Sequence, residues 1–300
     1  MAVNIIDNNN PTRSFAKIYK SEWRWWCVGA IFSFVLASVL MTGWPSGILP
    51  NLAYPYTYQG DGLSHSWLTL RAMEGWIFDN PRSGYPFGSD FLDYPGSDTG
   101  NILLLKIIGT IAGNYYGDIN LFFLLSFSVI FVASYCSLRT FELNKFFAFA
   151  ASLLFAFLPF HFQRLGHLFY LWYFVVPIVF FLCLSFYESK EKYFSQKDII
   201  FLFCTSIVLA SFGVYYALFG VIAFSVCAFA IFCRSESIKC IKAPVFAIVF
   251  VTAGVFLNIA PNIINKNLNG NNPEVAVRSA SEAETYGFKL MQLILPRAGH

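Results

Sequence analysis

Long runs of apolar residues without a charge, separated by short charged segments, constrain this chain more than any other feature. Several runs approach the roughly 20 residues that an α-helix needs to cross a hydrocarbon core about 30 Å thick. Because only 12% of its 300 residues are charged, the chain is too apolar for a water-soluble protein of this size. The sequence therefore predicts an all-α polytopic membrane protein and excludes a soluble multidomain protein.

The apolar runs predict about seven transmembrane helices. Residues 199–233 carry no charge and are too many for one crossing, so we expect two helices joined near Ser211, Phe212 and Gly213. Residues 101–113 are apolar but too few for a crossing, which predicts an interfacial or re-entrant helix. The expected crossings are 25–43, 119–138, 146–160, 168–187, 199–213, 217–233 and 244–262.

The distribution of charge predicts the orientation. More than half of the 20 lysines and arginines fall in the N-terminal segment 1–24 and in alternate short loops, which the positive-inside rule places in the cytoplasm. The transmembrane module is then 25–262, and its long first loop, 44–118, faces outward. Residues 263–300, with an amphipathic segment at their end, also lie outside, and the chain is compatible with a fragment of a longer protein. A bacterial inner membrane is favoured, and an endoplasmic reticulum membrane gives the same charge pattern.

Asp61, between Gly60 and Gly62 in the outer loop, is the leading candidate for a functional residue. Glycines let a ligand approach the backbone closely around this one carboxylate. Downstream, apolar residues recur at helical spacing over 63–76, which predicts a helix on the membrane surface with its apolar face in lipid. His65 would lie one turn from Asp61. The alternative for Asp61 is a turn-forming or helix-capping aspartate.

His161, Arg164 and His167 form a second candidate cluster, predicted to lie on the outer side. An arginine offers a fixed fork of donors to a phosphate, and each histidine adds another donor. A metal site is disfavoured because the arginine would repel a cation. The alternative is a short connector whose cations meet lipid headgroups.

The remaining candidates are polar residues expected on the same side. Proline, glycine and aromatic residues dominate 79–98, where Asp93 and Asp98 are candidates for binding sugar hydroxyls. Tyr215 and Tyr216 follow the expected turn and are further candidates for substrate binding. A divalent cation held by Asp90, Asp93 and Asp98 stays an open alternative, and no other cofactor is expected. No concentrated basic stripe points to nucleic acid as a partner.

This layout resembles the GT-C superfamily of polytopic glycosyltransferases. That family has an essential acidic residue in a large first outer loop, about seven helices in its membrane module, and polyprenyl-phosphate sugars as donors. The matching position here is Asp61. Many members have Asp-Glu or Asp-x-Asp where this chain has Asp61-Gly62, so the resemblance does not carry a metal requirement over.

The resemblance implies transfer of a sugar from a polyprenyl-phosphate carrier to a glycan or lipid acceptor of the cell envelope. Asp61 would act as general base in an inverting reaction, and Arg164, helped by His161 and His167, would stabilise charge on the leaving phosphate. Two alternatives stay open: a transporter of a lipid-linked saccharide or another solute, and a non-catalytic membrane subunit. The nearly charge-free crossings disfavour ion-coupled transport.

Overall fold

The computed structural model describes residues 18, 20–58, 61–78, 80, 82–84, 86–188, 196–234, 241–274 and 279–281. Within these ranges the chain is helical and has no strand, apart from one isolated bridge between Asn80 and Ser89. The helices are α2 (Trp23–Thr42), η1 (Ser46–Ile48), α3 (Gly62–Glu74), α4 (Thr99–Ala112), α5 (Tyr115–Thr140), α6 (Lys145–Ala156), α7 (Pro159–Gln163), η2 (Leu168–Tyr170), α8 (Val175–Glu188), α9 (Gln196–Ser211), α10 (Val214–Arg234) and α11 (Lys242–Asn269).

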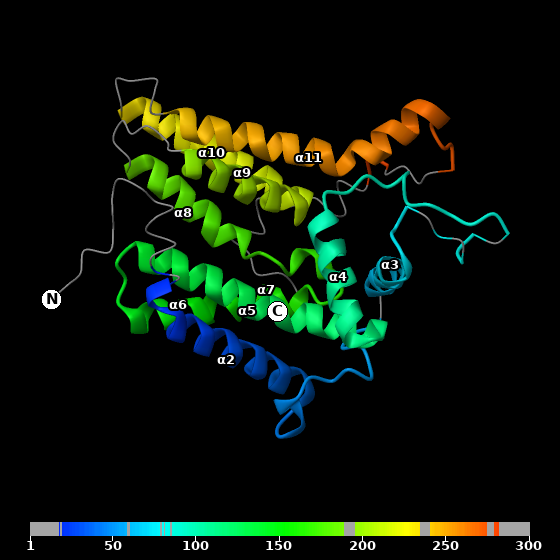
Figure 1. Ribbon diagram of the computed structural model, residues 1–300, viewed down its shortest axis with the longest axis horizontal. Helices are drawn as coiled ribbons and strands as arrows, with labels where there is room; N and C mark the ends of the chain where they lie inside the picture. The colour runs from blue at the N-terminus through cyan, green and yellow to red at the C-terminus, as the bar shows by residue number, and fades with distance from the viewer. Residues whose placement is uncertain are drawn as a thin grey trace.

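The helices form a bundle suited to a bilayer. Six described segments are long and apolar enough to cross a membrane: α2, α5, α6 with α7, η2 with α8, α10 and α11. The remaining expected crossing, α9, has 16 described residues and is about 24 Å long, so it falls short of that length. It nevertheless lies alongside α10 and α11 (Figure 1). The chain is thus an integral membrane protein of the all-α polytopic class, as the sequence predicts.

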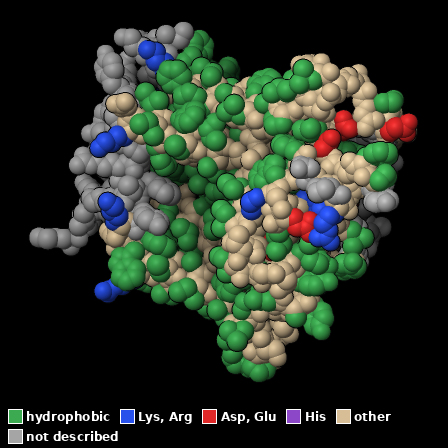
Figure 2. All heavy atoms as spheres, turned by 45° about the vertical axis from the view of Figure 1, so that its right-hand side comes forward, with side chains coloured by type: hydrophobic (Ala, Val, Ile, Leu, Met, Phe, Trp, Pro, Cys, Tyr) green, Lys and Arg blue, Asp and Glu red, His purple; other side chains and the backbone are tan. Residues whose placement is uncertain are grey.

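The two ends of the bundle differ in charge. At one end, called here the loop end, α3 and α4 lie beside the ends of α2 and α11 and the start of α5 (Figure 1). The acidic side chains visible in Figure 2 gather on the part of the face that belongs to this end, whereas hydrophobic side chains cover much of the rest. The opposite end, called the basic end, carries lysines and arginines at or beside the helix ends: Lys20, Arg24, Arg139, Lys145, Lys197, Arg234 and Lys242.

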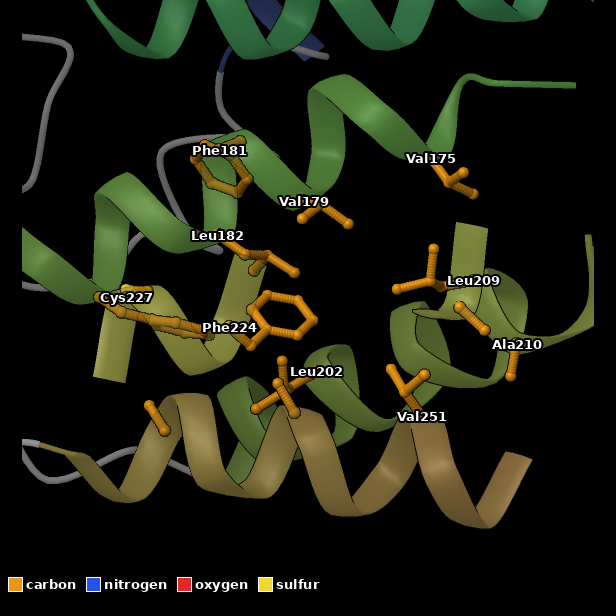
Figure 3. Close-up of a cluster of buried hydrophobic side chains, with 14 of the residues drawn as sticks. Val175, Val179, Phe181, Leu182, Leu202, Leu209, Ala210, Phe224, Cys227 and Val251 are labelled. Atoms are coloured by element: carbon orange, nitrogen blue, oxygen red, sulfur yellow. The ribbon is translucent and has the colours of Figure 1, made fainter. Parts of the chain in front are cut away.

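The core has two main parts. Around α5, fully buried phenylalanines pack against α2, α4 and α6, and Gly29 of α2 permits the close approach because a Cβ there would lie 1.9 Å from Phe131. The second part, shown in Figure 3, packs side chains of α8, α9, α10 and α11, with Phe224 and Leu202 pointing toward Leu182 and Val179. These clusters fix the helices whose ends carry the loops.

A buried ion pair joins α2 to α5 at the basic end. The Glu22 side chain, only 3% exposed, accepts hydrogen bonds from Arg139 Nε at 2.9 Å, Arg139 Nη2 at 2.7 Å and the Tyr135 hydroxyl at 2.7 Å. Lys145 Nζ lies 3.8 Å from the same carboxylate. The positive-inside rule counts Arg139 and Lys145 only as charges of a short loop, so the sequence did not predict this contact inside the bundle.

Two expected helices are interrupted. The crossing predicted at 146–160 ends as α6 at Ala156, because Pro159 begins the separate short helix α7. The crossing predicted at 168–187 consists of η2, an irregular stretch at 171–174, and α8. Leu171, Trp172 and Tyr173 in that stretch are buried. Irregular backbone at membrane depth is stable when protein surrounds it, as it does here.

The helices of the first long loop, residues 44–118, differ in part from expectation. α4 lies at the loop end instead of running through the bundle, as predicted for 101–113 (Figure 1). For α3, Leu68 and Ala72 are buried in a cluster with Ile77 and Ile102. Leu63, on the apolar face expected to contact lipid, is exposed, and contact of that face with lipid stays a prediction. The last helix, predicted to end at residue 262, continues to Asn269 with Pro261 inside it. The expected amphipathic segment at 286–295 lies outside the described residues.

Candidate functional site

The side chains of Asp61 and His167 are paired at the loop end. Asp61 Oδ2 lies 3.0 Å from His167 Nδ1, and both side chains are more than a third exposed. Asp61 precedes the first residue of α3, but its side chain makes no capping hydrogen bond to that helix. The Asp61 carboxylate therefore does not cap the helix, and the helix-capping alternative is not supported. Gly60 lies outside the described residues.

His65 supports the backbone of Asp61 from one turn further along α3. Its Nδ1 lies 3.1 Å from the Asp61 carbonyl oxygen, and its ring packs edge-on against Phe169 with 4.7 Å between ring centroids. Burial, together with the nearby His167, lowers the pKa of His65 to about 4. A neutral His65 at pH 7 can donate Nδ1–H to that carbonyl, so it positions Asp61 without adding charge.

Arg164 lies on the same turn as His167. The His167 backbone N–H donates to the Arg164 carbonyl at 2.8 Å. The Arg164 guanidinium stands 5.9 Å from the ring centre of Tyr170, which in turn packs against Tyr215 at 5.6 Å between centroids. The Tyr216 hydroxyl donates to the Tyr170 carbonyl oxygen. An exposed cation bordered by tyrosine hydroxyls can bind a phosphate, as the sequence suggested.

Asp98 extends this cluster toward α4. Its Oδ1 accepts a hydrogen bond from Asn101 Nδ2 at 3.1 Å, and the same amide group lies 3.4 Å from the Phe169 carbonyl oxygen. Asp98 lines a cavity of about 50 Å³ with the aromatic residues Trp76 and Phe91. Burial raises the pKa of Asp98 to about 6, although the hydrogen bond from Asn101 acts against that rise.

We expect Asp98→Asn to stabilise the protein at pH 8 and to have little effect at pH 4. Because folding raises this pKa from 3.8 to about 6, the folded state binds the proton more tightly. Its free energy of unfolding therefore falls as pH rises through that window. The penalty above pH 6 is at most about 3 kcal/mol, and asparagine removes it while keeping an acceptor for Asn101. Thermal unfolding in detergent at both pH values tests this, and an equal shift at both would contradict it.

His161 does not belong to the site. Its side chain is fully buried, and its ring stacks on Phe127 with 3.7 Å between centroids. Nε2 lies 2.8 Å from the Ser126 hydroxyl, and Nδ1 lies 3.1 Å from the Tyr173 hydroxyl. The prediction that His161 grips a phosphate was wrong, because the break before α7 turns this residue into the core while Arg164 and His167 stay at the surface.

We expect His161→Ala to destabilise the protein by about 2–4 kcal/mol, since it opens a cavity and leaves buried hydroxyl groups with fewer partners. His167→Ala should lower stability by less than about 1 kcal/mol, because its contact with Asp61 is exposed to solvent. Thermal unfolding of the two variants in the same detergent compares them. Equal losses of stability would contradict the different placement of the two histidines.

Asp93 also lies apart from the Asp61 pair. Its Oδ2 accepts a hydrogen bond at 2.7 Å from Asn272, beyond the end of α11. Nearby, Asn262 Nδ2 donates to the Leu92 carbonyl at 2.7 Å, so α11 anchors this part of the first loop. The described residues do not support the alternative of a divalent cation at Asp90, Asp93 and Asp98. They contain no group of three or more side chains that could hold a metal ion.

The sequence did not single out Phe169 and Tyr170. Phe169 contacts His65 and accepts from Asn101, and Tyr170 lies between His167, Arg164 and Tyr215. The sequence analysis assigned both to a transmembrane helix starting at residue 168, and only their position just after His167 could have pointed to a role in the site.

No protein-family model, curated protein or solved structure matches the chain.

Proposed function

We propose that this protein transfers a sugar from a polyprenyl-phosphate carrier to a glycan or lipid acceptor at the outer face of a bacterial inner membrane. The observation that carries the proposal is the pairing of Asp61 with His167 at the loop end, beside Arg164. Asp61 is about a hundred residues from Arg164 and His167 in the sequence. The sequence suggests a base at the first position and phosphate ligands at the other two. A GT-C type of glycosyltransferase fits this combination.

The Asp61–His167 pair would remove the proton from the acceptor. An imidazole that donates Nδ1–H to a carboxylate presents the lone pair of Nε2 as a proton acceptor, and the carboxylate then stabilises the imidazolium. The acceptor oxygen attacks the anomeric carbon and forms the new C–O bond. The bond between the anomeric carbon and the phosphate oxygen of the carrier breaks, and the phosphate leaves with the electron pair of that bond.

Arg164 would meet the leaving phosphate. The aromatic rings of Phe160 and Tyr170 lie 5.4 and 5.9 Å from its guanidinium and hold it at the surface. Charge that develops on the phosphate is stabilised without reorganisation when such a donor is already in place. His65, Asp98 and the two tyrosines, Tyr215 and Tyr216, border this surface.

The test is transfer by the purified protein in lipid nanodiscs. Radiolabelled polyprenyl-phosphate sugars should lose their sugar to an envelope acceptor, and Arg164→Gln should slow the reaction about 10²-fold. Arg82→Gln is the matched control, because Arg82 is an exposed arginine of the first loop that pairs with Glu74 and lies in another segment than Arg164. Binding of the donor without turnover would contradict the proposal and favour a transporter or a non-catalytic subunit.

A further inference from the structure

A groove on the side of the bundle has the features of a lipid site. One cavity of about 320 Å³ lies between α5, α6 and α8, and a second of about 210 Å³ lies between α8, α9 and α10. Both are walled almost entirely by apolar side chains, and they share Val176 and Phe180. Phe180 is 64% exposed, so the cavities open on the surface that faces the bilayer.

Two hydroxyl groups in the first cavity have no hydrogen-bond partner within the described part of the chain. Ser134 and Ser137 of α5 line it, each is 3% exposed, and neither Oγ has a hydrogen-bond partner among the described residues. A buried hydroxyl without a partner is costly, whereas a ligand that brings an acceptor removes the penalty. The groove therefore suits a molecule that is mainly hydrocarbon and carries acceptor oxygens at one end.

The depth of these serines identifies that end. Ser137 and Ser134 precede Arg139 by two and five residues, or about 3 and 8 Å along the helix. Arg139 and its partner Glu22 mark the polar boundary of the basic end. The ester carbonyls of a glycerophospholipid lie at such a boundary, and its acyl chains extend from there into the hydrocarbon core.

We propose that the groove binds one glycerophospholipid of the leaflet at the basic end. Its ester carbonyls accept hydrogen bonds from Ser134 and Ser137, and an acyl chain runs past Val176 and Phe180 toward Tyr216, which lines the second cavity. The site is distinct from the Asp61–His167 pair at the loop end, and it does not depend on the proposed transfer reaction.

The experiment offers the protein equal amounts of dioleoyl phosphatidylethanolamine and its diether analogue, which has no ester carbonyls, and counts retained lipids by native mass spectrometry. The wild type should retain one lipid and prefer the ester form about tenfold, as two net hydrogen bonds allow. The double variant Ser134→Ala with Ser137→Ala should lose that preference. Ala151→Trp, which fills the first cavity, should lose the lipid.

Two control variants lie on exposed faces outside the groove. Ser225→Ala on α10 and Ala253→Trp on α11 should keep both retention and preference. Retention by Ala151→Trp, or equal retention of ester and ether lipids by the wild type, would overturn the proposal. If Ala151→Trp fails to fold, the double serine variant still decides, because two small hydroxyl deletions leave the packing intact.

Discussion

Replacing Asp61 by asparagine should lower the rate of sugar transfer by about 10²–10⁴-fold, the usual contribution of a positioned proton acceptor. Asparagine has nearly the same shape, but it cannot stabilise an imidazolium at His167, whose Nδ1 lies 3.0 Å from the carboxylate. Because Asp61 is exposed and caps no helix, the change should leave folding and membrane insertion intact. Initial rates with radiolabelled donor measure the loss.

Asp90→Asn is the matched control for this change. Asp90 belongs to the same long loop as Asp61, and its Oδ1 accepts a hydrogen bond from the Leu92 backbone N–H at 2.9 Å, a role that an amide oxygen can fill. Its variant should transfer sugar at the normal rate. Normal transfer by Asp61→Asn would remove Asp61 from the proposed mechanism.

Replacing Glu22 by glutamine should destabilise the protein by about 3–5 kcal/mol, because it leaves the charge of Arg139 buried without a counter-charge. Glu22 is 3% exposed and accepts three hydrogen bonds, from Arg139 and Tyr135. The pairing tethers the start of α2 to the end of α5. Thermal unfolding in detergent, at equal protein and lipid content, measures the effect.

Glu142→Gln provides the control, since Glu142 is an exposed acid at the same end of the bundle. Its free energy of unfolding should change by less than about 0.5 kcal/mol. The double change Glu22→Leu with Arg139→Met should cost less than Glu22→Gln alone, because no buried charge is then left unpaired. A double variant that is less stable than the single one would contradict this account of the ion pair.

Hydrophobic patterning predicted the helices well because a bilayer allows few alternatives. Apolar runs of near membrane length become helices, and the turn predicted near Ser211 to Gly213 occurs where Gly213 adopts a positive φ of 119°. The breaks at Pro159 and at 171–174 were not predicted, because an apolar run looks the same in the sequence whether its backbone is helical or irregular. The irregular stretch is stable because the rest of the protein buries it, and a single sequence does not show that burial.

Part of the site could also be predicted. Polar residues in an otherwise apolar chain stand out, which is why the sequence points to Asp61, Arg164 and His167 as candidates. His161 is also a polar residue in an apolar stretch, but its packing against Phe127 places it in the core and not at the surface. The role of Glu22 was missed for a related reason: its partner Arg139 is more than a hundred residues away, and both resemble ordinary charges next to the membrane.

The central claim is that Asp61 and His167 act as one unit in transfer, and a double-mutant cycle tests it most directly. Values of kcat/KM are measured for the wild type, Asp61→Asn, His167→Gln and the double variant. If the two side chains act as a pair, the double variant should be no slower than the slower single variant, since either change already disables the proton acceptor. Losses that multiply in the double variant would show independent roles and contradict the claim.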